Sequence, residues 1–376
     1  MSELEALLAG MVRIDSSNPD LGGGPGEAAF AAHLARLMEK LGMEVDLWDA
    51  LPGRPNVVGR LPGAGGGRSL MLLGHLDVVA PWGPEAFTPV VREGRMYGRG
   101  AADMKCGFAA ALVAVEALIA DGARPAGDLL VAGVIDEEWE SAGATALPAR
   151  YRPDAAVLVE CTDLDVVSEH GGFAWYEIES RGVEAAGADP EHGVDGIALL
   201  APVLAGISAL DAELERRPRA AYGRGSVHAS TIAGGEQLPA YPALCTLGVE
   251  RCLIAGESVA QALAEMEGLL AAAREADPRF RGGLRTVVAR EALEQTVDEP
   301  IIATVAAAAA AALGRPPVLR GDIGWADSGL LVEAGIPVAT FGPVGHGEHT
   351  AGEWVDLASV ATTAQVLERT ARAFCI

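Results

Sequence analysis

Four short apolar runs, each followed by a histidine or an acidic residue, are the strongest constraint on what this chain can fold into. The runs cover residues 69–73, 128–135, 154–159 and 336–341. The spacing of apolar residues also predicts helices over 25–42 and over 104–121, and the second of these separates the first two runs. Continuous apolar strands separated by helices are typical of an α/β sheet covered on both faces.

The middle of the chain has a different pattern. We expect strands over 173–180 and 243–250, and helices over 193–214 and 258–277. The ends of these expected strands are not rich in acidic residues, unlike the strand ends elsewhere in the chain. We therefore expect a smaller α+β domain over residues 168–285, inserted into a larger domain formed by 1–167 and 286–376. A length of 376 residues fits two domains.

Two low-complexity stretches have simple structural interpretations. The glycine cluster at 63–67 lies between two expected strands, and no Lys-Ser/Thr pair follows it. We expect a flexible hairpin loop there rather than a phosphate-binding loop. The alanine run at 306–312 is far too short to span a membrane and predicts a buried helix.

Charge and cysteine content exclude several classes of partner. The chain has 28 Lys and Arg against 52 Asp and Glu, a net charge of −24, which argues against nucleic acid or an anionic membrane as the main partner. The first residues include acids and no basic stretch, so we expect no secretory signal. Five scattered cysteines form neither a disulfide framework nor a CxxC zinc motif, and this favours a reducing, cytoplasmic setting.

The residues that follow the apolar runs are candidate metal ligands. Ligands of open α/β sheets bind beyond the carboxyl ends of the strands, so these side chains are expected to converge. Two imidazoles and three carboxylates suit a pair of divalent ions such as zinc. Taken singly, each histidine or acid is more simply a packed or solvated residue, but burying so many ionisable groups together is costly without a cation. The candidates are His75, Asp103, Glu138, Glu160 and His349.

Two further acids have positions that suggest supporting roles. Asp77 lies two residues beyond His75 and can accept a hydrogen bond from the second ring nitrogen of that histidine. Glu137 adjoins Glu138, so one carboxylate can bind metal while the other stays free. A free carboxylate beside a metal-bound water is a natural general base.

With these residues in place, the sequence resembles the M20 metallopeptidase family, which includes acetylornithine deacetylase, succinyl-diaminopimelate desuccinylase, aminoacylases and carboxypeptidases. The similarity is greatest to the acetylornithine deacetylase/desuccinylase-like branch. It implies a zinc-peptidase-like three-layer α/β/α catalytic domain and an inserted, ferredoxin-like α+β lid domain that often forms a dimer contact. The matching stretches, in family order, are 74–112, 135–144, 157–163, 170–182 and 341–356.

The resemblance also implies a role for each candidate. His75 and Glu160 would hold one ion, Glu138 and His349 the other, and Asp103 would bridge them. The ions are expected to be zinc, with cobalt as the alternative.

Other residues receive supporting roles by the same resemblance. Glu137 would be the general acid/base, and Asp77 would orient His75. His349 is preferred to His346 because the family spacing is His, three residues, then Glu-x-Val, which here includes Glu353. Cys106, close to the expected metal loop, is given a structural role.

The middle domain departs from the family pattern. Ala186 stands where the family has a histidine that helps to stabilise the oxyanion, and Cys252 stands where an arginine commonly grips a substrate carboxylate. Arg251 and Cys252 are therefore the candidate substrate residues, with His228 and His192 as further substitutes. Each of these also has a simpler interpretation as a surface or sheet residue.

The expected function is a metal-dependent hydrolase that cleaves the amide bond of a small N-acyl amino acid or dipeptide-like substrate through a metal-activated water. The alternative is an M20-like metal-binding protein with a rebuilt lid site, which binds a ligand or acts on an atypical substrate with little or no standard deacylase activity. A purely structural α/β protein is disfavoured by the clustered ligands. A homodimer through the lid domain is expected from the resemblance.

Overall fold

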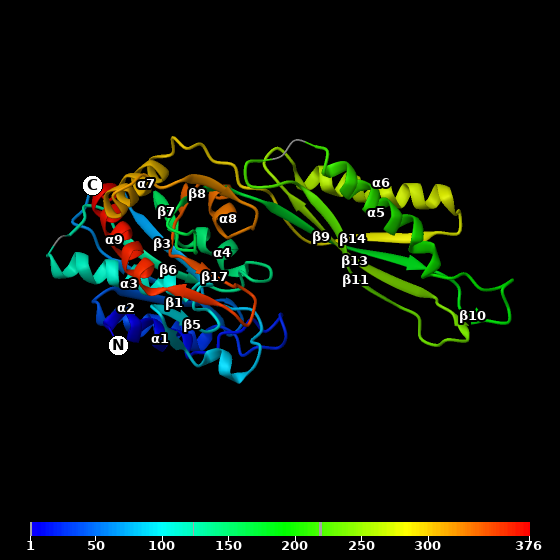
Figure 1. Ribbon diagram of the computed structural model, residues 1–376, viewed down its shortest axis with the longest axis horizontal. Coiled ribbons are helices and arrows are strands. Elements are labelled where there is room, and N and C mark those ends of the chain that lie inside the picture. The colour runs from blue at the N-terminus through cyan, green and yellow to red at the C-terminus, as the bar shows by residue number, and fades with distance from the viewer. Residues whose placement is uncertain (1, 123, 218–219) are drawn as a thin grey trace. The chain divides into compact units, whose positions relative to one another are not determined.

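The computed structural model describes residues 2–122, 124–217 and 220–376, which fall into two compact units (Figure 1). Unit 1 comprises the chain up to Ser168 together with Gln295–Arg320 and Ala326–Ile376, and unit 2 comprises Glu169–Glu294 and Gly321–Trp325. The expected boundary at 285 falls inside the last strand of unit 2, and the short return segment at 321–325 was not expected.

Unit 1 is built on an eight-stranded mixed sheet. Strand β3 runs parallel to β6 and to β7, and β16 runs parallel to β7, so the carboxyl ends of four central strands lie at one edge. The α/β prediction is confirmed. In sheet order the strands are β1 (Glu44–Leu51), β2 (Arg54–Leu61), β6 (Leu129–Val134), β3 (Leu70–His75), β7 (Ala155–Leu158), β16 (Val338–Thr340), β8 (Val166–His170) and β15 (Leu319–Asp322).

Helices cover both faces of this sheet because side chains alternate along each strand. Leu72 packs with the large helices on one face, whereas its neighbours Met71 and Leu73 pack on the other face. The result is the expected three-layer arrangement. The first face is covered by α1 (Glu3–Val12), α2 (Ala28–Lys40), α3 (Lys105–Ala120), α7 (Pro300–Leu313) and α9 (Leu357–Phe374), and the second by α4 (Ala142–Ala146), η2 (Leu147–Ala149) and α8 (Ser328–Glu333).

A small four-stranded sheet of unit 1 carries two of the site loops. Its order is β17-β18-β5-β4, and η1 (Pro84–Phe87) precedes it in the chain. The strands are β4 (Val90–Arg92), β5 (Arg95–Tyr97), β17 (Gly345–His346) and β18 (Trp354–Asp356).

The glycine cluster at 63–67 is not a hairpin loop, which corrects the sequence-based expectation. Strand β6 lies between β2 and β3 in the sheet, so this segment crosses from one strand to a non-neighbour. The chain passes close to residues 125–127: a Cβ at Gly63 would lie 2.4 Å from the Ala126 carbonyl oxygen, and one at Gly67 would lie 2.4 Å from the Gly127 nitrogen. Glycine is therefore required by close backbone approach.

The alanine run lies in α7, where Ala308 and Ala309 are buried, as predicted. The helix begins with Pro300 in its first turn and ends at Gly314, which has a φ of +68°. Among the described residues no helix is long and apolar enough to cross a membrane.

Unit 2 has the ferredoxin-like arrangement that was expected. Its chain order is strand, helix, two strands, helix, strand, and the antiparallel sheet has the order β11-β13-β9-β14. Apolar residues of α5 and α6 pack against one face of this sheet. The elements are β9 (Gly172–Arg181), α5 (Ala201–Leu214), β11 (Ser226–Gly234), β13 (Leu244–Leu253), α6 (Val259–Ala276) and β14 (Arg281–Arg290).

The first helix of unit 2 begins later than expected. Residue Val194 pairs with Val183 in an isolated bridge, and a short turn η3 (Ala198–Leu200) leads into α5, which has a proline in its first turn. The second helix, α6, begins where expected because Ser258 caps it and exchanges hydrogen bonds with Gln261. A two-stranded ribbon of β10 (Ala185–Ala186) and β12 (Ala240–Tyr241) completes the unit.

Candidate metal centre

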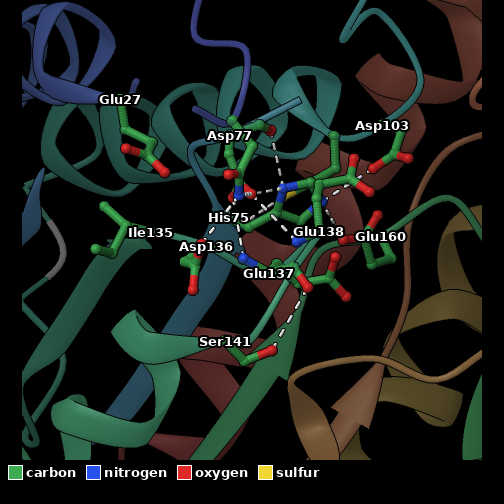
Figure 2. A network of polar contacts seen from close by, with 12 residues as sticks. Glu27, His75, Asp77, Asp103, Ile135, Asp136, Glu137, Glu138, Ser141 and Glu160 are labelled. Atoms are coloured by element: carbon green, nitrogen blue, oxygen red, sulfur yellow. Dashed lines mark hydrogen bonds and ion pairs between the residues drawn. The ribbon is translucent and has the colours of Figure 1, made fainter. Parts of the chain in front are cut away.

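The expected ligands meet at the carboxyl ends of the parallel strands of unit 1. His75 is the last residue of β3, Glu160 follows β7, and Glu138 follows β6. Asp103 lies in the loop before α3, and His349 lies in the loop between β17 and β18. Figure 2 shows His75, Asp103, Glu138 and Glu160 gathered around one point.

Asp103 contacts both histidines, one with each carboxylate oxygen. Its Oδ1 lies 2.9 Å from His75 Nε2, and its Oδ2 lies 3.2 Å from His349 Nε2. Glu160 Oε1 is 3.2 Å from His75 Nε2, and Glu138 Oε2 is 3.1 Å from His349 Nε2. The five side chains thus form two sets, each with one imidazole and one private carboxylate, that share a third carboxylate.

This donor set fits a pair of divalent cations. One ligand atom from each of His75, Asp103 and Glu138 lies within 4.8 Å of the others. Imidazole nitrogens and carboxylate oxygens are the ligands that zinc takes in catalytic sites, and a carboxylate with two free oxygens can bridge two ions.

The site carries more negative than positive charge, and burial makes this costly. Burial raises the pKa of Glu138 to about 7 and also raises the pKa of Glu160. Burial would raise the pKa of Asp103 as well, but hydrogen bonds with His349 and His75 hold it well below its usual range. Hydrogen bonds to Asp103 and Glu138 raise the pKa of His349 to about 10. The carboxylates therefore compete for positive charge that two imidazoles supply only in part.

Asp77 contacts two parts of the site, the His75 ring through its backbone carbonyl and the Glu137–Glu138 loop through its carboxylate. Its fully buried carboxylate accepts the backbone N–H groups of Glu137 and Glu138, each at 3.1 Å. His75 Nδ1 lies 3.0 Å from the Asp77 carbonyl oxygen but 3.6 Å from its nearer carboxylate oxygen. The backbone carbonyl is therefore the closer partner of the His75 ring, and the carboxylate fixes the loop that bears the acid pair.

A buried polar network beneath Asp77 was not expected from the sequence. Asn18 Nδ2 donates to Asp77 at 2.8 Å and to Asp136 at 3.0 Å. Arg54 donates to the same Asp136 oxygen at 2.7 Å and forms a two-point pair with Glu27. These partners are far apart in sequence and lie in loops and at strand ends, so no periodicity reveals them.

Asp327 is a second residue that sequence reasoning missed. It is 1% exposed, and among the described residues neither of its carboxylate oxygens has a hydrogen-bond partner. Burial raises its pKa to about 7. Burial also raises the pKa of Glu137 well above its usual range, and the negative charge of Asp327 adds to this. Asp327 therefore adds a further unneutralised carboxyl group near the expected general base.

Two cysteines, Cys106 and Cys161, contact the backbone of the Asp103 loop. Cys106 Sγ lies 3.2 Å from the Ala102 carbonyl oxygen, as does Cys161 Sγ, and the two sulfurs are 3.7 Å apart. Both thiols thus contact the loop that carries Asp103. His346 lies outside the ligand cluster, with its ring against Trp354 and Nε2 3.5 Å from Asp163.

Arg251, which the sequence suggested as a substrate residue, is engaged with other side chains of its own unit. Its side chain is 1% exposed, inside unit 2. The guanidinium donates to Glu257 at 2.9 and 3.0 Å and to Glu265 at 2.9 Å. Its hydrogen-bonding capacity is thus used inside the unit, where it ties β13 to the start of α6 and to α6 itself.

Cys252 lies on the opposite face of β13 from Arg251 and is half-buried. It pairs in register with Phe173 of β9, whose ring centroid lies 4.9 Å from that of Trp175. Trp175 donates its indole N–H to Glu250 at 2.8 Å. This face of unit 2 therefore presents aromatic rings and a carboxylate.

The other lid candidates are exposed or small. His228 lies 3.6 Å from Glu250, and His192 pairs with Asp189 at 2.8 Å, both with exposed rings. Ala186, in the ribbon, has no functional group.

Comparison with known proteins identifies relatives along most of the chain. The profile of Peptidase family M20/M25/M40 matches residues 71–373. The chain is 27% identical to N-formyl-4-amino-5-aminomethyl-2-methylpyrimidine deformylase of Bacillus subtilis, covering 89% of this chain and 86% of that protein. It is 31% identical to the protein of that name from Halalkalibacterium halodurans, with coverage of 74% and 69%. Acetylornithine deacetylase of Proteus mirabilis is 26% identical, with coverage of 91% and 89%.

Solved structures show the same fold at low identity. A tripeptidase from Staphylococcus aureus superposes with a TM-score of 0.82 at 18% identity, covering 99% of this chain and 98% of that one. A dinuclear metal binding peptidase of the M20 family from Bacillus subtilis gives a TM-score of 0.71 at 16% identity, with coverage of 98% and 97%.

Proposed function

The chain belongs to peptidase family M20/M25/M40 and is an amidohydrolase or peptidase of that family, and on that premise we propose that it hydrolyses the amide bond of a small N-acyl amine. The observation that carries this proposal is the placement of Asp103, which faces His75 with one oxygen and His349 with the other. A shared carboxylate between two imidazole-carboxylate sets is what a two-ion site requires.

In this proposal each ion has its own pair of ligands. His75 and Glu160 would hold one ion, His349 and Glu138 would hold the other, and Asp103 would be shared between them. Zinc is the expected metal and cobalt the alternative, since the donors are nitrogen and oxygen. When bound, such ions polarise a carbonyl group and lower the pKa of water.

Glu137 is proposed to move the proton. Its backbone N–H is fixed by Asp77 at 3.1 Å, and burial raises the pKa of its carboxyl group well above the usual range, so the side chain can hold a proton between steps. Glu137 takes a proton from the attacking water and delivers it to the amide nitrogen as the C–N bond breaks. The products are a carboxylate and an amine.

The test is Glu137→Ala together with Glu137→Gln. General acid–base groups typically contribute about 10²–10⁴-fold, so kcat is expected to fall by that factor while metal content stays at the wild-type level. His346→Ala is the matched control, because this histidine lies outside the ligand cluster. Unchanged turnover in either Glu137 variant would refute the mechanism.

We propose a small N-acyl amino acid or dipeptide-like amide as the substrate, in keeping with the acetylornithine deacetylase among the relatives. A second candidate is the formamide of an amino-substituted pyrimidine. Two relatives carry that activity in their names. In addition, Arg251, which was considered as a partner for a substrate carboxylate, is hydrogen-bonded to glutamates inside unit 2, and a formamide of a pyrimidine needs no such partner. Comparison of kcat/KM on N-formyl, N-acetyl and N-succinyl derivatives of both amine classes separates the two.

The alternative to catalysis is a protein that binds metal and ligand with little turnover. The same panel tests it: two bound ions with no hydrolysis of any amide would favour the binder. The position of Glu137 next to a ligand supports the enzyme.

A homodimer through unit 2 is also proposed. Strand β11 is the outer strand of its sheet and pairs with β13 on one side, its residues 228–234 are exposed, and Ile232 is 55% exposed. Such an edge favours pairing with another strand. Light scattering of the wild type and of Ile232→Lys tests this. We further propose a reducing, cytoplasmic setting, supported by five free cysteines.

A further inference from the structure

Glu353 is a buried carboxylate of unit 1 that lies outside the proposed ligand set. It is 1% exposed, lies directly before β18, and follows His349 by four residues. Its contacts reach a different segment of the chain, residues 98–103, which ends in Asp103.

Glu353 makes four hydrogen bonds to residues 98–103. Its Oε1 accepts the backbone N–H groups of Ala102 at 3.0 Å and Asp103 at 3.1 Å. Its Oε2 accepts from Arg99 Nη1 at 2.5 Å, and its carbonyl oxygen accepts the N–H of Gly98 at 3.3 Å. Together these bonds hold the Asp103 loop against the strand that closes the His349 loop.

These bonds also explain why Glu353 is not itself a metal ligand. One oxygen is used by two backbone donors and the other by the guanidinium of Arg99. Arg99 is 2% exposed and lies over the ring of Trp82, 5.1 Å from its centroid, so the pair is enclosed. A carboxylate whose two oxygens are engaged in this way is not available to bind a metal ion.

The two histidines differ in how much they need such an anchor. The His75 side chain is 2% exposed and stands at the end of a buried strand, whereas the His349 side chain is 58% exposed. His349 also has a φ of 59°, within a loop between two short strands. Packing therefore fixes His75, while the position of His349 relative to Asp103 depends on what anchors its loop.

We propose that Glu353 is a positioning residue that sets the distance between His349 and Asp103 and thereby controls the ion bound by His349, Glu138 and Asp103. The ion bound by His75 and Glu160 depends on it much less. This inference rests on the ligand assignment proposed above, and it concerns one half of the site.

The experiment is a titration of the metal-stripped full-length protein with cobalt, followed by absorption spectroscopy and by competition with a chromophoric chelator. Wild-type protein is expected to bind two ions in distinguishable steps. In Glu353→Gln one ion, the one assigned to His349, Glu138 and Asp103, is expected to lose about 10–100-fold in affinity, as happens when a partner that orients a ligand is removed, while the other changes by less than about threefold. Glu333→Gln is the matched control, since it makes the same chemical change on an exposed side chain of unit 1, at the end of α8.

Glu353→Asp provides a second variant that keeps the charge opposite Arg99 but shortens the side chain by one methylene. It is expected to show the same selective loss, and it decides the matter if Glu353→Gln does not fold. Two ions bound by either folded variant with wild-type affinities would overturn the inference alone. Equal weakening of both ions would also overturn it, because it would show a general structural role. Fewer than two ions bound by the wild type would overturn the two-ion proposal and this inference with it.

Discussion

Unit 1 and unit 2 each bury a cluster of charged side chains, and the two clusters differ in balance. In unit 2, Arg251 and Arg217 share Glu257 and Glu265 through ion pairs of 2.7–3.8 Å, and Arg217 also pairs with the exposed Glu213 at 2.8 Å, so each of the two less exposed anions meets two cations. In unit 1 the carboxylates around His75 and His349 outnumber the imidazoles, and Asp327 adds another with no hydrogen-bond partner among the described residues.

The difference is the one expected between a structural cluster in unit 2 and the proposed cation-binding cluster in unit 1. A balanced cluster satisfies its own charges and needs nothing from outside. A cluster with surplus buried negative charge is stable only with added protons or cations, which is why raised carboxyl pKa values gather in unit 1.

The largest expected effect comes from removing the cations that unit 1 is proposed to bind. Chelation is expected to lower kcat/KM by about 10³-fold, because metal ions supply several kcal/mol to such reactions. The melting temperature should fall as well, since ions that bind only the folded state stabilise it. Zinc or cobalt should restore both. Full activity in a preparation with less than one ion per chain would contradict the prediction.

The next largest effect should come from unbalancing the cluster of unit 2. Arg251→Met removes the buried cation that pairs with Glu257 and Glu265. The free energy of unfolding, measured by urea denaturation, is expected to fall by about 3–5 kcal/mol. Metal affinity should stay unchanged. Arg285→Met is the control, because Arg285 is an exposed residue 3.2 Å from Glu177 and should cost less than about 1 kcal/mol. Equal costs would show that burial of the pair does not matter.

A smaller effect is expected at Asp77. Asp77→Asn keeps the backbone carbonyl that contacts His75 but replaces one of the oxygens that accept the N–H groups of Glu137 and Glu138. Zinc affinity should fall by about 10–100-fold, measured by chelator competition. If it does not fall, the carbonyl alone orients His75.

The smallest effect concerns Asp327 and pH. Its folded pKa of about 7 lies above the ordinary 3.8, so between these values the folded protein retains a proton that the unfolded chain has released, and stability falls as pH rises through this window. Asp327→Asn removes the titration. The metal-free variant should melt about 1–2 °C above wild type at pH 8, with a smaller difference at pH 5. The same difference at both pH values would rule out a charge effect.

The convergence of the proposed ligands could be predicted because several of them follow buried strands. His75 ends β3, and Glu160 follows β7, so local hydrophobic pattern and parallel topology were enough to bring them together. Family spacing then selected His349 over His346.

The contacts that could not be predicted join distant segments of the chain, even where the residue itself was noted from the family spacing, as Glu353 was. Asn18 reaches Asp77 and Asp136 across 59 and 118 positions, and Glu353 reaches Asp103 across 250. Arg251 shows a different limit. Alternation along β13 places it on the same face as Val249, Leu247 and Cys245, which are buried, so period-two reading of this strand would have assigned it to the interior.

The order of the chain has a consequence for its synthesis. Unit 2 is almost continuous in sequence, from Glu169 to Glu294, whereas unit 1 needs α9 and the His349 loop from the far end. During translation, all the segments of unit 2 have been made while unit 1 still lacks strand β16 of its large sheet, strands β17 and β18 of its small sheet, the covering helices α8 and α9, and the proposed ligand His349. No ribosome-bound chain that stops before residue 349 can hold the full set of proposed ligands, so the growing protein can acquire its proposed cations only after that residue has been added.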